Sequence, residues 1–508
     1  MQEQPIPIRS LPGIKRDGTV LEGDHYIDGQ WCRFQRGKPR KMGGFQVVAI
    51  VPELARGINS LSANALQYVH IGGSTTFNQY QVNNSGTLSS SADRTPAALI
   101  DSPNNLWQID TLFEPTGGAN RLIAHAGQNL GDIASTVETP VWFGTVTDTN
   151  ILINTGIPSV SGGIVAVGVY LFSFGNNGRI AWSPPNNPTS IAASSGGGEA
   201  FITQQKIVRG IPLRGAGSGP AALFWSLDSL IRATFVGGTA IWDFDTLSTE
   251  ISILSSQSII EYDGVFYWTG VDRFLMFNGV VREVPNNLNQ NWFFDNLNFT
   301  ERQKVFAFKV PRFGEIWWCY PRGSATECTH AVIYNVREGT WYDTQLPDSG
   351  RSIGLYAKVY NKPFMVGVDF IDDFLGYRLW QHETGVDQTV GLVDEAIQSY
   401  FETAEISMLT LSQPLNKSTH VGRVEPDFRQ TGDMSLTIRG RANARAPFVE
   451  GTPVSFSDVA SQSDQETLKL KEIRRLMSFR FESNVQGGDY EMGDIFAHIA
   501  PADGRMES

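Results

Sequence analysis

The residues best suited to surface chemistry form one basic segment near the start of the chain. Five of the nine residues at 33–41 are basic. Such a run can contact phosphates or an acidic partner surface, and a solvated loop is the common alternative. Aromatic residues beside arginine are frequent where two surfaces meet, and this segment has them at its start. We therefore predict a partner-docking site made of Trp31, Arg33, Phe34, Arg36, Lys38, Arg40 and Lys41.

The other reactive residue types do not form a recognisable catalytic or metal-binding motif. The seven histidines are scattered, and no His or Cys pair has the spacing that holds zinc. Cys319 lies in an aromatic strand-like run, where a thiol behaves as a small apolar group, and no base is evident beside it. The glycine-rich runs at 196–198 and 214–219 lack the Lys-Ser or Lys-Thr of a phosphate-binding loop. The sequence thus predicts no catalytic residue, no cofactor, no metal site and no enzymatic activity.

Length and composition describe a folded chain. It has 508 residues, of which 41% are hydrophobic, and a net charge of −12 at pH 7. This apolar content can offset the conformational entropy lost on folding, which argues against intrinsic disorder. The acidic balance argues against nucleic acid wrapped over the whole surface. The three cysteines are too few for a disulfide framework, and the start lacks the features of a signal peptide. We therefore expect a protein that is neither exported nor inserted in a membrane.

Glycine and proline punctuate short alternating runs along the chain. The 51 glycines and 25 prolines separate runs rich in aromatic and β-branched residues, which is typical of strands joined by tight turns. One example is 265–277, which ends at Asn278-Gly279, a pair that favours a type I′ turn. Similar units begin about every 35–60 residues, which overlaps the length of a four-stranded propeller blade. The sequence predicts an all-β chain with a β-propeller of six or seven irregular blades, and a pair of stacked sheets is the alternative.

The two ends of the chain differ from this middle part. Beyond residue 395, apolar and polar residues alternate at 434–439 and at 478–482, as in half-buried strands. With further runs of this kind, they suffice for a small domain of two sheets. The first 55 residues are rich in Gly, Pro and charge and have weak periodicity. We therefore predict an extended N-terminal docking arm at 1–55, a β-propeller body at 56–395 and a C-terminal β-sandwich domain at 396–508.

Several further segments occur in an order that spans nearly the whole chain. Among them are Asp-Gly-Gln-Trp at 28–31 and Glu-Ile-Trp-Trp at 315–318. The full set comprises 18–23, 28–31, 41–45, 206–210, 222–230, 261–268, 274–279, 315–318, 479–484 and 487–493. In these segments the chain resembles the tail nozzle or tail hub proteins of short-tailed DNA bacteriophages. This family includes packaged-DNA stabilisation proteins and podovirus-type tail tubular proteins.

The resemblance implies a structural role in a virion without catalysis. It implies a homo-hexameric ring below the portal and its adaptor, which continues the DNA channel and retains the packaged genome before ejection. The implied partners are copies of the same chain, the portal-adaptor (head-tail connector) protein, tail fibres or spikes, and a tail needle or plug. Double-stranded DNA would pass transiently and without specific binding. The implied location is the virion tail, assembled in the host cytoplasm, with no membrane insertion by this chain.

The net charge adds one hypothesis to this interpretation. If acidic residues line a sixfold lumen, they repel phosphate and let DNA slide. The alternative function is a receptor-binding or glycan-degrading phage tail protein on a similar scaffold. Such a protein needs a carboxylate-rich aromatic groove, which sequence does not mark because the separation of two carboxylates is three-dimensional. A carbohydrate-binding propeller of cellular origin is a third interpretation.

Overall fold

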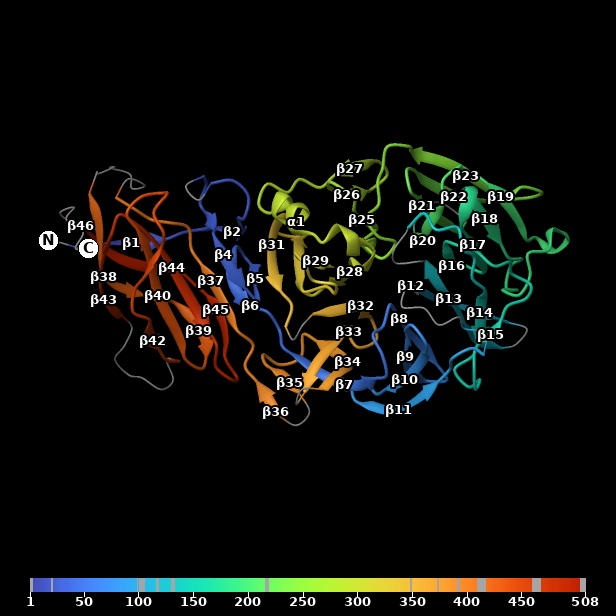
Figure 1. The fold of residues 1–508 in the computed structure, drawn as a ribbon, viewed down its shortest axis with the longest axis horizontal. Helices are drawn as coiled ribbons and strands as arrows, with labels where there is room; N and C mark the ends of the chain where they lie inside the picture. Colours follow the sequence, from blue (N-terminus) through green and yellow to red (C-terminus); the bar gives the residue numbers. More distant parts are fainter. Residues whose placement is uncertain are drawn as a thin grey trace.

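In a computed structural model of the chain, β-strands form two bodies that lie end to end in an elongated molecule (Figure 1). A β-propeller occupies one end, and a second all-β body, here called the end domain, occupies the other. Within the described residues, the one α-helix is α1, Gln290–Asn296. The predicted all-β fold, a propeller with an added β domain, is confirmed. The structure describes residues 3–19, 22–97, 99, 106–115, 118–128, 133–214, 219–347, 350–371, 374–390, 393–408, 417–458 and 467–502.

The propeller has seven blades within the described part of the chain. Six of them contain four consecutive antiparallel strands, and the seventh contains three consecutive strands and one strand from the start of the chain. Blades 1 to 3 are β8 Gly57–Ala63, β9 Leu66–Gly72, β10 Phe77–Val82 and β11 Leu88–Asp93; β12 Leu106–Glu114, β13 Ala119–Gln128, β14 Val141–Gly144 and β15 Leu152–Ile153; β16 Gly163–Val167, β17 Tyr170–Phe174, β18 Arg179–Trp182 and β19 Gly198–Phe201. Blades 4 to 6 are β20 Ile207–Leu213, β21 Ala221–Ser226, β22 Leu230–Gly237 and β23 Ile241–Ser248; β24 Ile260–Tyr262, β25 Val265–Thr269, β26 Phe274–Phe277 and β27 Val281–Glu283; β28 Phe306–Val310, β29 Glu315–Tyr320, β30 His330–Asn335 and β31 Thr340–Gln345.

Blade 7 closes the ring with a strand from the start of the chain. It contains β32 Arg351–Ala357, β33 Lys362–Ile371 and β34 Phe374–His382, and β34 pairs with β7, Phe45–Val51. Two short strands, β35 Gln388–Val390 and β36 Val393–Glu395, extend the sheet beyond β7. The first strands of neighbouring blades contact one another from blade 1 to blade 4 and from blade 5 to blade 7, and β32 of blade 7 contacts β8 of blade 1. The propeller is therefore closed by residues more than 320 positions apart in sequence.

The hairpin between β24 and β25 shows how local sequence produces a blade. Tyr262 lies opposite Val265, so the turn consists of Asp263 and Gly264 alone. Both residues have positive φ, 50° and 83°, which is the conformation of a type I′ turn. The turn therefore matches the twist of the two strands that it joins.

The next hairpin differs from the sequence prediction. Phe277 lies opposite Val281, which leaves a loop of three residues rather than two. Gly279 has a φ of 108°, but Asn278 is not among the residues with positive φ. The type I′ turn predicted at Asn278-Gly279 is therefore wrong, because the strand register places one more residue in the loop.

The segment that joins blades 4 and 5 lies across the inner part of the propeller. Ser255, Ser256 and Ser258 in this segment are buried. The side-chain amide of Gln257 donates to the backbone oxygens of Arg56 at 2.8 Å and Trp107 at 3.2 Å. Arg56 lies just before blade 1, and Trp107 lies in blade 2, so one side chain links three parts of the ring. The segment fills the inner side of blade 5, where β24 is short.

The end domain contains three further sheets and one parallel strand pair. The first sheet runs β1 Gln4–Ile8, β46 Ile495–Ala502, β38 Ser418–Glu425 and β43 Leu468–Arg474. The second runs β4 Asp28–Gln30, β37 Ser399–Glu402, β44 Leu476–Ser483 and β40 Met434–Arg441, with β41 Val449–Glu450 and β42 Val454–Phe456 beside β40. The third runs β39 Phe428–Thr431, β45 Asp489–Met492, β6 Lys38–Lys41 and β5 Cys32–Gln35. The parallel pair is β2 Leu11–Ile14 and β3 His25–Tyr26.

The N-terminal arm runs through the end domain, where it adds one strand to each of the first two sheets and two strands, β5 and β6, to the third. Strand β1 pairs with β46, β4 pairs with β37, and β6 pairs with β45. The arm then continues into β7 of the propeller. A single buried core accordingly extends from Tyr26 and Phe401 in the end domain to Trp317 in blade 6 and Trp380 in blade 7. The arm and this core fix the two bodies against each other.

Candidate partner interface

The basic segment at 33–41 forms a hairpin between the two bodies. In this hairpin Gln35 of β5 lies opposite Lys38 of β6. The two-residue turn between them has positive φ at Arg36 and Gly37, 54° and 72°, as a type I′ turn requires. The backbone N–H groups of Arg36 and Gly37 donate to the carboxylate of Glu338 in blade 6, at 2.8 and 3.1 Å. The tip of the hairpin is therefore fastened to the propeller.

Arg33 makes the central ion pairs of this junction. Its Nε lies 2.9 Å from Oε1 of Glu315 in β29, and the two side chains are 1% and 0% exposed. Its Nη1 donates to Oε2 of Glu383, which follows β34, at 2.9 Å. Tyr342 donates its hydroxyl proton to Oε1 of Glu315 at 2.6 Å. Burial raises the pKa of Glu315, and the Arg33 guanidinium opposes that shift. Because both partners are shielded from water, Glu315 depends on Arg33 for compensation of its charge, whereas Arg33 has a second carboxylate in Glu383.

The aromatic residues of the segment face the propeller of the same chain. Trp31 lies edge-on to Trp317 of blade 6 at 6.1 Å and to Phe45 at 6.2 Å between ring centroids. Phe34 lies 5.4 Å from Tyr342 in the same edge geometry. Such edge-to-face pairs add to the stabilisation that comes from burial. Trp31 and Phe34 thus dock the hairpin on blade 6.

Lys41 is the second buried cation of the segment. Its Nζ donates to the backbone oxygen of Gly488 at 2.6 Å, and the residue is 2% exposed. Burial lowers the pKa of Lys41, and the nearby Asp387 and Asp489 oppose this shift. The ammonium group of Lys41 is therefore bound within the end domain of its own chain.

The cations at the surface have carboxylate or amide partners within the chain. Arg36 forms an ion pair with Glu491 although its side chain is 79% exposed. The Nζ of Lys38 lies 2.7 Å from Oδ1 of Asp494. Arg40 donates to the side-chain oxygen of Gln35 at 3.0 Å. An acidic partner would have to compete with these groups, and exposed ion pairs of this kind contribute little stability.

Arg40 also borders a crevice on the third sheet of the end domain. The crevice has a volume of about 360 Å³ and is lined by both signs of charge. Arg40 and Arg429 face Asp489 and Glu491 in this lining. The segment's charge is therefore balanced locally.

These contacts correct part of the predicted docking site. Trp31, Arg33, Phe34 and Lys41 are buried within the chain, so they cannot reach a partner in this structure. Their burial has a physical reason, because each side chain packs against the propeller or bonds to a group of the propeller or the end domain. Arg36, Lys38 and Arg40 lie at the surface and stay predicted partner contacts.

Sequence reasoning missed the acidic partners, which come from distant parts of the chain. Glu315 carried the clearest signal, because it opens the run Ile-Trp-Trp-Cys-Tyr of a strand that is buried throughout. A carboxylate in such a strand requires a buried partner. Glu383 and Asp494 follow strand ends, Glu491 lies in the short strand β45, and none of them gave a comparable signal.

A second concave site lies beside α1. Its residue from the N-terminal arm, Asp17, precedes the hairpin in sequence. The site has a volume of about 490 Å³, and its lining includes Asp17, Glu283 and the amide residues Asn286, Asn287, Gln290 and Asn291. Asp17 is held in place because its two carboxylate oxygens accept the backbone N–H groups of Asn291 and Trp292, each at 2.8 Å. Glu283 ends β27 and is exposed. Carboxylates and amides together can bind the hydroxyl groups of a sugar.

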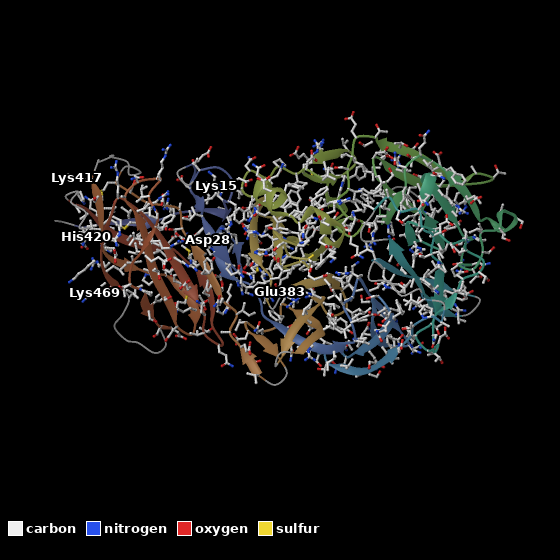
Figure 2. The ribbon with its side chains drawn as sticks, viewed as in Figure 1. Lys15, Asp28, Glu383, Lys417, His420 and Lys469 are labelled. Carbon is white, nitrogen blue, oxygen red and sulfur yellow. The ribbon has the colours of Figure 1, made fainter. Side chains whose placement is uncertain are left out.

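Figure 2 shows the side chains over the whole molecule, with Lys15, Asp28 and Glu383 in the middle third and Lys417, His420 and Lys469 at the far end of the end domain. Across the described ranges, no group of three or more His, Cys, Asp and Glu side chains could hold a metal ion. In the same residues, no helix is long and apolar enough to cross a membrane.

Some of the segments that carry the family resemblance meet at this junction, namely 28–31, 315–318, 479–484 and 487–493, whereas those at 206–210, 222–230, 261–268 and 274–279 lie in blades 4 and 5. Residues 28–31 and 479–484 lie in neighbouring strands on either side of β37, and Arg40 of β6 lies opposite Glu491 of β45. Trp31 and Arg33 contact Trp317 and Glu315 of the segment 315–318. Segments that lie far apart in sequence therefore form one structural unit.

Comparison with known proteins gives similarity of fold and no family. No protein-family model matches the chain, and no curated protein matches its sequence. One similar solved structure is an exo-β-1,3-galactanase from Phanerochaete chrysosporium with galactose, at 10% identity, a TM-score of 0.29, and coverage of 90% of this chain and 100% of that one. Another is a putative 6-phosphogluconolactonase from Bacteroides uniformis, at 11% identity, a TM-score of 0.37, and coverage of 60% of this chain and 92% of that one. Neither likeness assigns a reaction or a ligand to this chain.

One prediction is nevertheless corrected by these comparisons. The sequence predicts no enzymatic activity, whereas both of these solved structures are named as enzymes. The absence of a catalytic sequence motif is weak evidence against enzymatic activity on a β scaffold, since a catalytic carboxylate pair is defined by its spacing in three dimensions. Catalysis is therefore a function to be tested.

Proposed function

We propose that this chain is a structural protein of a bacteriophage tail, in the nozzle or hub ring below the portal and its adaptor. The observation that carries this proposal is the junction between the two bodies, where three of the resembling regions meet. Such a unit has a physical purpose in a ring, because it fixes the angle between the two bodies of each subunit. Rigid subunits are needed if the rotation that relates neighbours is to close a ring.

The propeller axis does not serve as a DNA channel in this proposal. The segment at 254–258 is largely buried, and it contacts the start of blade 1 and blade 2 through Gln257 and blade 5 through Leu254, whose N–H donates to Thr269. Double-stranded DNA would instead pass through the lumen between subunits. A net charge of −12 favours a lumen that repels phosphate, so that DNA slides through.

The proposed partners follow from the position in the tail. The chain would contact copies of itself in a hexamer, the portal-adaptor protein on one side, and fibres, spikes and a needle or plug on the other. Arg36, Lys38 and Arg40 are the proposed contacts of the basic hairpin. The protein would be assembled into virion tails in the host cytoplasm.

Electron microscopy of the purified full chain, over a range of concentrations, tests this function. We expect rings with sixfold symmetry whose lumen admits duplex DNA, and we expect the same ring in virion tails. The charge-reversed variant Arg36→Glu/Lys38→Glu/Arg40→Glu should remain folded and lose ring or tail assembly. The variant Arg179→Glu, which alters a half-exposed cation of blade 3, is the matched control. Monomers at every concentration, together with absence of the chain from virions, would refute the proposal.

The groove beside α1 favours a second candidate function, recognition or cleavage of glycans. It offers the exposed carboxylate of Glu283 and the amides of Asn287, Gln290 and Asn291 to a sugar, while the carboxylate of Asp17 is bound to two backbone N–H groups. The test is depolymerisation of bacterial surface polysaccharides by the full chain, followed by reducing-end release. Glu283→Gln should abolish cleavage, whereas Asp295→Asn, an exposed acid of α1 outside the groove, should not. Equal activity of both variants would remove the groove from consideration.

A further inference from the structure

A crevice between blades 4 and 5 combines cationic and apolar walls. It has a volume of about 420 Å³ and lies where β20 and β22 of blade 4 face the hairpin turns of blade 5. The two blades are neighbours in the ring, as Figure 1 shows. The hairpin at 33–41 and the groove beside α1 share no lining residue with this crevice. Its chemistry can therefore be considered separately.

One wall carries two guanidinium groups, and each of them has an acidic neighbour within the chain, Asp245 for Arg232 and Glu261 for Arg214. Arg232 of β22 forms an ion pair with Asp245 of β23, in which Nη2 lies 2.7 Å from Oδ2. This contact fixes the guanidinium, whose side chain is 41% exposed. The Nε of Arg232 is buried and has no hydrogen-bond partner among the described residues. Arg214, an exposed residue directly after β20, contributes a second guanidinium to the same crevice.

The opposite wall is apolar and open. Phe277 of β26 is 5% exposed, and Leu213 of β20 is partly buried against the same apolar cluster. Gly264 and Gly279, in the two turns of blade 5, complete this side. A Cβ atom built on either glycine would have no heavy atom within 4 Å, so the turns leave free space above the apolar floor. Thr234 adds a hydroxyl group to the lining.

These walls define the chemistry of a ligand. Guanidinium groups bind planar anions through paired N–H donors, and an apolar floor with few polar groups suits the face of a small ring. We propose that this crevice binds an acidic pyranose, such as the uronic acid unit of an anionic polysaccharide, with its carboxylate on Arg232 and Arg214.

This proposal does not rest on the tail function or on the groove beside α1. A chain that never forms rings could still bind the sugar here, and a ring protein could fail to bind it. The proposal of a sugar-binding crevice and the proposal of a tail function can therefore be refuted independently of each other.

The test uses the full chain and three sets of probes. Saturation-transfer NMR and calorimetry would compare oligosaccharides of glucuronate or galacturonate, the neutral glucose or galactose oligomers of equal length, and glucose 6-phosphate. We expect binding of the uronate oligomers at least 10-fold tighter than that of the neutral oligomers, and weaker binding at high salt. The phosphate probe distinguishes a general anion site from one that prefers a carboxylate.

Variants locate the binding. Arg232→Ala and Arg214→Ala should each weaken uronate binding about 10-fold or more. Arg282→Ala should leave it unchanged, because Arg282 is an exposed cation of β27 in the same blade but outside the crevice. Thermal unfolding checks that each variant is folded. Equal affinity for charged and neutral oligomers, preference for the phosphate, loss of binding with Arg282→Ala, or no binding at all would overturn the proposal.

Discussion

Arg33 of the N-terminal arm and Glu315 of blade 6 form a fully buried ion pair, 2.9 Å long, at the boundary between the two bodies. The pair joins residues 282 positions apart. Tyr342 and Trp317 also donate to the same carboxylate, at 2.6 and 2.9 Å, so both of its oxygens are satisfied. The junction is accordingly sensitive to loss of either charge.

Glu315→Gln should destabilise the chain by about 1.5–3 kcal/mol, because it removes one of the two carboxylates that compensate the buried Arg33 charge and leaves Glu383 as the other. Urea unfolding followed by tryptophan fluorescence measures this change. The control is Glu199→Gln, which removes a half-exposed pair with Arg179 at 2.9 Å and should cost no more than about 1 kcal/mol. Replacement of both buried partners, Arg33→Met with Glu315→Leu, should recover much of the loss. Equal effects of Glu315→Gln and Glu199→Gln would contradict the role of the buried pair.

Closure of the propeller by β7 predicts a contrast between two adjacent residues. Val51→Asp places a carboxylate in the core of blade 7, where Val51 is 2% exposed, and should cost several kcal/mol. Ile50→Asp alters the next residue of the same strand, which is 68% exposed, and should have little effect. Thermal unfolding and limited proteolysis of blade 7 measure the difference. Similar sensitivity at both positions would mean that β7 does not close the ring.

Gln257 should be important for stability although it lies in a loop. Gln257→Leu would leave the backbone oxygens of Arg56 and Trp107 without this donor, at a cost of about 1–3 kcal/mol for each group that stays unsatisfied. Gln204→Leu, at an exposed position in the connection between blades 3 and 4, is the matched control. Denaturant midpoints of the two variants provide the comparison. A midpoint for Gln257→Leu equal to that of the control would show that water replaces the bridge.

The buried histidines predict loss of stability in mild acid. Burial lowers the pKa of His70 and of His125 to about 4, below the ordinary value of 6.5. The unfolded chain therefore takes up protons between pH 6.5 and pH 4 that the folded chain does not. Their contribution to stability is fully present above pH 6.5 and falls with pH through this window, by up to about 1.4 kcal/mol per pH unit for each histidine.

His125 provides the direct test of this pH dependence. Its Nδ1 accepts the backbone N–H of Gly127 at 3.0 Å, so protonation there would break the bond. His125→Gln should flatten the decline of the free energy of unfolding between pH 6.5 and pH 4, measured by urea titration at several pH values. Parallel slopes for the variant and the original chain would assign the acid sensitivity to other groups.

The sequence was informative where structure is local. Alternation and turn residues predicted the propeller and the second β domain, because strands and hairpins depend on neighbouring residues. The hairpin at 278–279 was predicted with the wrong turn, since register depends on how two strands slide past each other. The sequence also did not reveal which residues of the basic segment are buried. Arg33 and Arg36 look alike in sequence, and only the distant Glu315 and Glu383 make one of them an interior residue.

The pairing of β7 with β34 has a consequence for the order of events during synthesis. Residues 45–51 leave the ribosome early, but their partner at 374–382 appears only after the other six blades have been made. Contacts of such long range slow folding and expose unpaired strand edges in the meantime. The nascent chain therefore carries an open ring for most of its translation. Chaperones that cover strand edges would have their longest opportunity to act on this protein before blade 7 is complete.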